Sequence, residues 1–274
     1  MGDLQYPDRA ERCLHAAVTD ITDLGLDLDQ IWYLGDSSTS RYNGDPWDSP
    51  DVQLLQDMDL PLRFVMGNHD VERICVDHRD SVPMHDVVQA VSDWKTTASV
   101  EDIGFVDHLG DITVVFLTDH VALDGSWCVH HGEHRHGNPE SYPYTKADYQ
   151  QFLGEAVAES NPLIIAGHNA FAGGNRPAAL QDWFLPLPPS VAVHLHGHAH
   201  IGDEDRLKHP YRTISYVKDQ AIPQIDVASL EDKRDPLIRS AILEITTTNS
   251  LYIHLRDHTN QRWLEHYARP LESL

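Results

Sequence analysis

The sequence predicts an α/β fold with two packed β-sheets flanked by helices. Up to Gly197, short apolar runs typical of buried strands alternate with stretches of helical periodicity. After Gly197 the pattern changes to alternating β segments. Strands that first alternate with helices and then follow one another indicate two sheets packed together, with helices on the outside.

The first predicted elements follow from apolar spacing and a glycine stop. Apolar residues recur at helical spacing over residues 9–24, and Gly25 supplies a stop for that helix. The apolar runs 30–34 and 63–66 predict two strands, and the segment 54–58 predicts a short helix before the second strand.

The rest of the chain supplies further strands and one more helix. The β-branched run 112–117 predicts another buried strand. Thr145, with Asp148 three residues later, predicts the start of a helix. The segments 242–247 and 251–255 predict the two strands of an antiparallel hairpin.

Length and composition predict one domain. A chain of 274 residues lies within the range of large single α/β domains. We expect a single domain over residues 1–274, in which residues 205–274 supply strands that complete the second sheet. The three cysteines have no paired spacing, and no apolar stretch reaches the length of a transmembrane helix. We therefore expect a reduced, cytoplasmic protein with no membrane partner, and we leave the oligomeric state open.

The chain is strongly acidic. Its formal net charge is −23, because 43 acidic residues face only 20 lysines and arginines. Abundant Asp with scarce Lys resembles the surface of a salt-adapted, halophilic protein; a merely acidic mesophilic enzyme is the alternative. Such a surface repels nucleic acid. It does not exclude a small phosphorylated substrate, because bound divalent metal ions reverse the local charge.

Four apolar runs end at a glycine that is followed by a potential metal ligand. Ligands gather at the carboxyl ends of strands in layered α/β folds, and glycine allows the tight turn needed there. Asp, Asn and His without Cys describe a divalent metal site with mixed oxygen and nitrogen ligands. The four junctions are Gly35-Asp36, Gly67-Asn68-His69-Asp70, Gly167-His168 and Gly197-His198-Ala199-His200.

These motifs, taken in this order, resemble those of the calcineurin-like metallophosphoesterases. The resemblance extends from Asp3 to His200, most of the chain. It implies the metallo-dependent phosphatase fold, a four-layer α/β/β/α sandwich of two mixed sheets flanked by helices. It also implies two divalent metal ions, a binuclear centre that binds and activates a phosphoester.

The family pattern assigns a role to each matching residue. The carboxylate that bridges the two ions falls on Asp36. The neutral ligands of one ion fall on Asn68, His168 and His198. The other ion takes His200 and the first motif, Asp3 and Gln5.

Two further residues match the catalytic pair of the family. The histidine that protonates the leaving group or steadies the transition state falls on His69. Asp70 would hold the imidazole of His69 in its productive tautomer. General acids of this kind typically contribute about 10²–10⁴-fold to the rate.

The first motif differs from the usual Asp-x-His of the family. Here it is Asp3-Leu4-Gln5, and a Gln carbonyl coordinates a metal more weakly than imidazole does. Branches with Asp-x-Gln include Mn²⁺-dependent enzymes that cleave ADP-ribose and CDP-alcohols, and a protein-phosphatase-like branch. We therefore favour Mn²⁺, with Fe or Zn as alternatives. Only two residues precede Asp3, so the first strand is truncated unless the true start lies upstream.

The resulting functional prediction is a metal-dependent phosphoric ester hydrolase. A metal-bridging hydroxide would attack the phosphorus of a phosphodiester, a nucleoside-diphosphate derivative or a phosphomonoester. A phosphoprotein phosphatase is a second enzymatic alternative. The competing class is a catalytically impaired scaffold that serves as a protein-interaction subunit, which Gln5 and the short first strand favour. His69 and Asp70 favour catalysis, since neither is needed merely to fold.

Two histidines of the same apolar run are assigned to the protein interior. His194 and His196 continue an alternating row with His198, but Gly197 interrupts the pleat. We expect them in the core or behind the metal ligands.

Overall fold

The computed structural model describes 11 strands and three helices. Its described residues are 1–2, 4, 7–36, 50–65, 67, 104–117, 146–157, 161–168, 170–171, 186–198, 214–217, 220–227, 229–230 and 237–271. The helices are α1 (Pro7–Asp23), α2 (Pro50–Gln56) and α5 (Lys146–Val157). The strands are β1 (Ile31–Leu34), β2 (Leu62–Val65), β3 (Gly104–Leu109), β4 (Ile112–Leu117), β5 (Leu163–Gly167), β6 (Val191–His196), β7 (Ile214–Tyr216), β8 (Pro223–Asp226), β9 (Arg239–Ile245), β10 (Ser250–Asp257) and β11 (Arg262–Pro270).

Six strands form the larger sheet, in the order β3-β4-β5-β6-β8-β7. The four central strands run parallel, and the edge strands β3 and β7 run antiparallel to their neighbours. Every described side chain of β4, β5, β6 and β8 is buried, as expected for parallel strands covered on both faces. The parallel direction brings the carboxyl ends of β5 and β6 to one edge of the sheet, where Gly167 pairs with His196.

The second β layer contains two separately paired sheets, a parallel pair and an antiparallel meander, which we together call the smaller sheet. β1 pairs with β2, and β9, β10 and β11 form a meander in the order β11-β10-β9. The N-terminal segment lies beside β1: the amide of Leu34 donates to the carbonyl of Met1 (2.7 Å), and the amide of Leu4 donates to the carbonyl of Asp36 (2.7 Å). The short first segment is therefore paired along the strand that leads to Asp36.

The same segment also connects the two parts of the smaller sheet. On its other side, the amide of Leu230 donates to the carbonyl of Gly2 (3.2 Å). The amide of Arg239 at the start of β9 then donates to the carbonyl of Ser229 (3.0 Å). Backbone hydrogen bonds thus run from β2 and β1 through residues 1, 2 and 4 and residues 229–230 to β9, β10 and β11.

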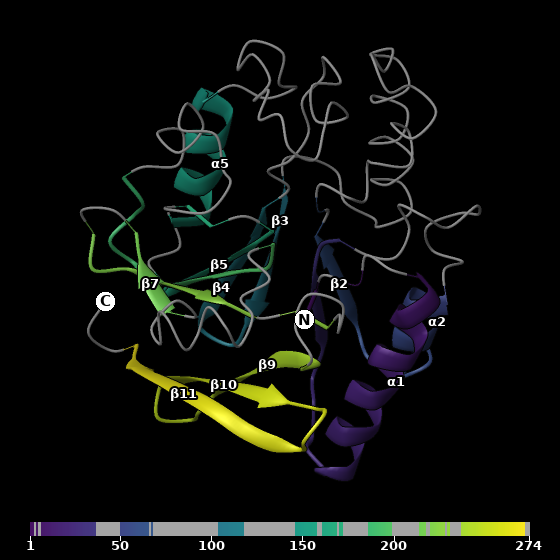
Figure 1. Ribbon diagram of the computed structural model, residues 1–274. Coiled ribbons are helices and arrows are strands. Elements are labelled where there is room, and N and C mark those ends of the chain that lie inside the picture. Colours follow the sequence, from purple (N-terminus) through teal and green to yellow (C-terminus); the bar gives the residue numbers. More distant parts are fainter. Residues whose placement is uncertain are drawn as a thin grey trace, which may run out of the picture.

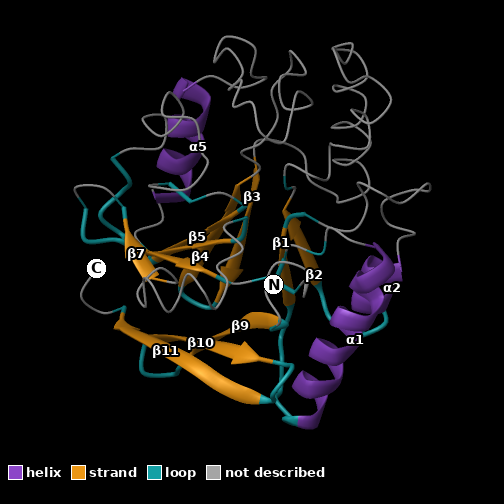
Figure 2. Cartoon of the chain, in the orientation of Figure 1, coloured by secondary structure: helices purple, strands orange, loops and turns teal. Residues whose placement is uncertain are grey.

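Figure 1 shows the layers of the molecule, and three apolar clusters lie between them. The first packs α1 and α2 against the outer face of β1 and β2. The second fills the space between the two sheets, with side chains from β1, β4, β5, β6, β9 and β10. The third packs α5 against the outer face of the larger sheet. The arrangement is the predicted four-layer α/β/β/α sandwich of two mixed sheets flanked by helices, and Figure 2 shows the helices outside the strands.

Within the described residues, none of the helices combines the length and the apolar character that crossing a membrane requires.

Candidate metal centre

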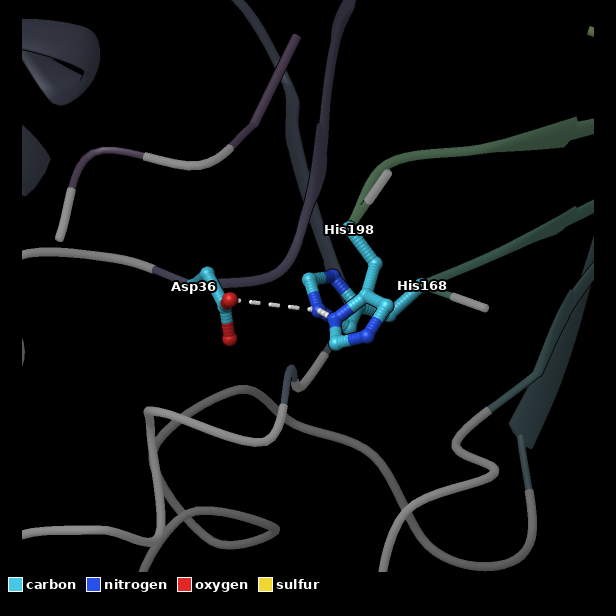
Figure 3. A group of neighbouring side chains, drawn as sticks. All are labelled: Asp36, His168 and His198. Atoms are coloured by element: carbon cyan, nitrogen blue, oxygen red, sulfur yellow. Dashed lines mark hydrogen bonds and ion pairs between the residues drawn. The ribbon is translucent and has the colours of Figure 1, made fainter. Parts of the chain in front are cut away.

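Three of the predicted ligands meet at the ends of three strands. Asp36 follows β1, His168 follows β5 and His198 follows β6. One ligand atom from each lies within 4.8 Å of the others. Figure 3 shows the two imidazoles facing the carboxylate, with the ion-pair contact between His168 and Asp36 drawn as a dashed line. Parallel strands of two different sheets thus deliver these side chains to one place.

Asp36 is held in an unusual backbone conformation in a fully buried position. Its φ is +57°, and its side chain is 0% exposed. Besides the hydrogen bond from Leu4, its carbonyl lies 3.4 Å from the hydroxyl of Tyr33. Positive φ is uncommon outside glycine, although Asp tolerates it better than most residues. The turn after β1 therefore aims this carboxylate into the interior at a cost in backbone energy.

Two glycines leave the room that the centre needs. Gly35 has φ +84°, and a β-carbon there would lie 2.6 Å from Nδ1 of His168. A β-carbon on Gly67 would collide with the carboxylate and the amide of Asp36. The glycines of the Gly35-Asp36 and Gly67-Asn68 junctions are thus required by close approach as well as by turn geometry.

The hydrogen bonding of His168 fixes its tautomer. Its side chain is fully buried, and its Nδ1 lies 2.7 Å from the carbonyl oxygen of Leu34. A carbonyl can only accept a hydrogen bond, so Nδ1 carries the proton. In the neutral imidazole, Nε2 then presents a lone pair, 3.3 Å from Oδ2 of Asp36 and 3.1 Å from Nδ1 of His198.

His198 completes the group from the neighbouring strand. Its φ is +64°, and its ring centroid lies 5.0 Å from that of His168 at an interplanar angle of 71°. The amide of Gly197 donates to the carbonyl of His168 (3.1 Å), which ties the ends of β5 and β6 together. His198 is less buried than its two partners, so it lies on the solvent side of the group.

The donor set fits a divalent cation. A carboxylate oxygen and the Nε2 lone pair of His168 face each other, and two acceptors at 3.3 Å repel unless a proton or a cation lies between them. One carboxylate and two imidazoles without thiolate suit Mn²⁺, Fe²⁺ or Zn²⁺ better than Mg²⁺ or Ca²⁺. Three side chains of the described part therefore offer three ligand atoms for one metal site.

Six predicted site residues lie outside the described residues, and they stay predictions. Their described neighbours contact Asp36: Leu4 donates to its carbonyl, and Gly67 packs against its carboxylate. Leu4 is flanked in sequence by two of the predicted ligands, and Gly67 precedes a third. The six residues are Asp3, Gln5, Asn68, His69, Asp70 and His200.

The two histidines expected in the interior are buried there. His194 is 0% exposed and stacks on Phe171 with ring centroids 3.9 Å apart. His196 is 4% exposed, and its Nδ1 lies 2.9 Å from the carbonyl of Gly197. Both side chains pack in the interior at the end of β6, directly before the turn that carries His198.

One contributor to the centre had no signal in the sequence. The carbonyl of Leu34 sets the tautomer of His168, although 134 residues separate the two in the chain. A backbone oxygen is available at every position, so only the three-dimensional arrangement identifies this one.

Comparison with known families agrees with the fold. The model of the family described as calcineurin-like phosphoesterase matches residues 1–202, and the chain belongs to this family. Membership identifies a phosphoester hydrolase that uses divalent metal ions. No curated protein sequence matches the chain.

Two solved structures are similar in fold. A dimetal phosphatase from Danio rerio superposes with a TM-score of 0.66 at 14% identity, covering 98% of this chain and 96% of that one. A purple acid phosphatase from seeds of yellow lupin (Lupinus luteus) superposes with a TM-score of 0.56 at 10% identity. That match covers 97% of this chain and 49% of the lupin chain. At these identities the likeness shows the fold alone.

Proposed function

We propose that the protein is a binuclear metal-dependent phosphoesterase whose metal centre is built around Asp36. The observation that carries the proposal is the convergence of Asp36, His168 and His198 within 4.8 Å at the carboxyl ends of three strands. Two divalent ions bound there would neutralise phosphoryl oxygens and lower the pKa of a water between them.

The proposed metal-binding role of each residue follows from the chemistry of its side chain. Asp36 has two carboxylate oxygens and would contact both ions. His168 is oriented by the Leu34 carbonyl so that Nε2 is available to an ion and would serve as its ligand. One ion would be held by Asn68, His168 and His198, and the other by Asp3, Gln5 and His200.

His69 and Asp70 would act on the substrate side. We assign proton donation to the leaving oxygen to His69, with Asp70 fixing the imidazole tautomer. This pair distinguishes an active enzyme from a scaffold of the same fold, because a scaffold needs no general acid.

The substrate we propose is small: a phosphodiester, a nucleoside-diphosphate derivative or a phosphomonoester. The net charge of −23 disfavours a polyanionic partner such as nucleic acid. We favour Mn²⁺ because a Gln carbonyl is a hard, neutral ligand that suits Mn²⁺ better than Zn²⁺.

The test is hydrolysis of an aryl phosphodiester and an aryl phosphomonoester in Mn²⁺ at molar KCl. Asp36→Asn and His69→Ala should each lower turnover by at least about 10²-fold. Asp59→Asn is the matched control, because Asp59 also has positive φ (+54°) but is exposed. The ratio of diester to monoester turnover would narrow the substrate class.

The scaffold alternative makes the opposite prediction. A folded, metal-loaded protein that turns over neither ester, or that does so equally well as Asp36→Asn, would reject the enzymatic proposal. The short first segment favours the scaffold, but its pairing with β1 and its hydrogen bond to Asp36 weaken that objection.

A further inference from the structure

A second histidine group lies on β10 and β11, outside the Asp36 centre. His254 of β10 and His266 of β11 are directly opposite each other in the antiparallel register. Directly opposite residues place their side chains on the same face, with β-carbons about 4.5–5.5 Å apart. Here the two rings turn toward each other, and their Nδ1 atoms are 2.6 Å apart.

Glu244 of β9 sets the orientation of one of these rings. Its Oε2 lies 3.2 Å from Nε2 of His254. An ionised carboxylate only accepts hydrogen bonds, so Nε2 of His254 carries the proton and donates it. In the neutral ring the Nδ1 lone pair then points at His266. A carboxylate on the far nitrogen is the usual way in which proteins orient a metal-binding histidine.

Aromatic rings surround the pair and restrict its motion. Trp263 lies with its ring centroid 5.7 Å from that of His254 and 5.9 Å from that of His266. Tyr252 stacks parallel to His254 at 6.0 Å. The side chain of His254 is only 20% exposed as a result, while the pair as a whole still borders solvent.

We propose that His254 and His266 form a cross-strand binding site for one borderline divalent transition-metal ion, such as Ni²⁺, Cu²⁺ or Zn²⁺. Bonds of about 2.0–2.1 Å to one ion require the two nitrogens to be roughly 3 Å apart, so the rings must open by less than about 1 Å. Imidazole selects these ions over Mg²⁺ and Ca²⁺. The net charge of −23 draws cations to the surface at low ionic strength.

The site differs in kind from the Asp36 centre. Its two nitrogens come from the C-terminal meander, and Glu244 is a positioning residue on the far side of one ring. An ion bound by both histidines would cross-link the edge strand β11 to β10. The competing interpretation is a plain hydrogen bond between the rings, with a proton where the ion would be.

The test counts Ni²⁺ ions bound per chain by equilibrium dialysis in excess Mn²⁺. Excess Mn²⁺ would fill the Asp36 centre but competes weakly with Ni²⁺ for imidazole, since it stands lowest in the affinity series. Any Ni²⁺ that replaces Mn²⁺ at the Asp36 centre is counted equally in every variant, so only the difference between variants reports the second site. We expect His254→Gln and His266→Gln each to bind one Ni²⁺ ion fewer than the unaltered protein. The matched control is His108→Gln on β3, an exposed histidine outside the pair, which should bind as many as the unaltered protein.

The variants also separate the ligands from the positioning residue. Glu244→Gln should weaken Ni²⁺ binding about 10–100-fold without abolishing it. Ni²⁺ should raise the melting temperature of the unaltered protein and of His108→Gln but not of the two histidine variants. An unchanged Ni²⁺ count in both histidine variants would overturn the proposal, and so would a loss confined to one of them. Because His266 is exposed on an edge strand, its substitution leaves the fold intact.

Discussion

Asp20 accepts two hydrogen bonds from the guanidinium of Arg256, a residue 236 positions later in the chain. Nε and one terminal nitrogen of Arg256 each lie 2.7 Å from a different carboxylate oxygen. Asp20 is 2% exposed and Arg256 is 4% exposed, so the pair is removed from water. This ion pair joins α1 in the outer layer to β10 in the smaller sheet, and thereby connects the N-terminal helix with the C-terminal strands.

Removing the carboxylate charge should destabilise the protein strongly. Asp20→Asn removes the carboxylate that is hydrogen-bonded to the buried guanidinium of Arg256, and breaking such a pair costs about 3–5 kcal/mol. Urea unfolding measures the loss. Asp23→Asn, an exposed position on the same helix, is the control and should change the free energy of unfolding by less than about 0.5 kcal/mol. Equal losses in the two variants would contradict the role given to Asp20.

A third residue extends this network without creating a second active site. Nδ1 of His258 lies 2.8 Å from Asp20, and its Nε2 lies 2.8 Å from the hydroxyl of Ser240. The order of groups is that of a hydrolytic Ser-His-Asp triad, but Ser240 is 0% exposed and His258 is 3% exposed. We expect Ser240→Ala to retain full phosphoesterase turnover, measured with the two aryl esters. Turnover that falls with this variant while stability holds would assign Ser240 a catalytic role.

The same network should make stability depend on pH. Burial lowers the pKa of His258 below 6.5, so between that lowered pKa and 6.5 the unfolded chain holds more protons than the folded one. The free energy of unfolding rises with pH wherever this is so. The contribution of His258 is therefore complete above pH 6.5 and is lost as the pH falls through the lowered pKa.

Asp20 acts in the same direction at lower pH. Burial alone raises the pKa of its carboxyl, but hydrogen bonds from Arg256 and His258 outweigh this and hold the pKa below 3.8. Its contribution is present above pH 3.8 and is lost as the pH falls through the lowered value. Urea unfolding of the unaltered protein and of His258→Gln, compared from about pH 7 down to about pH 5, isolates the contribution of His258. His258→Gln should flatten the slope there, and an unchanged slope would contradict the assignment.

Elements with a strong local signal were predictable from the sequence. The β-branched run 112–117 is β4, and the helix predicted over 9–24 is α1 (Pro7–Asp23). No local pattern predicted β11 (Arg262–Pro270), where charged, aromatic and small residues are mixed. This edge strand is defined by its pairing with β10, and such non-local pairing leaves a weak sequence pattern.

The candidate site was predictable where side chains carry the chemistry. Asp36, His168 and His198 each follow an apolar run and a glycine, and the parallel strands bring them together. The orientation of His168 was not predictable, because it depends on the backbone carbonyl of Leu34 across the gap between two sheets. The ion pair of Asp20 with Arg256 was equally hidden, since charged residues so far apart in sequence give no pattern.

Crowding at Gly35 should matter more than its backbone angle. Gly35→Ala places a methyl group 2.6 Å from Nδ1 of His168 and also imposes φ +84° on alanine. Gly110→Ala is a close control, because Gly110 has φ +60° and nothing lies within 4 Å of a β-carbon there. Gly110→Ala should therefore lose only the free energy that a left-handed backbone costs alanine, about 1–2 kcal/mol.

The difference between these two variants measures the crowding of a β-carbon at Gly35 against Nδ1 of His168 and the backbone of Gly67. Gly35→Ala should lose more free energy of unfolding than Gly110→Ala, and it alone should weaken Mn²⁺ binding, because the displaced ring no longer donates to Leu34. Urea unfolding and calorimetric Mn²⁺ titration measure the two effects. If both variants bind Mn²⁺ as the unaltered protein does, then the hydrogen bond to Leu34 does not position His168 for the metal.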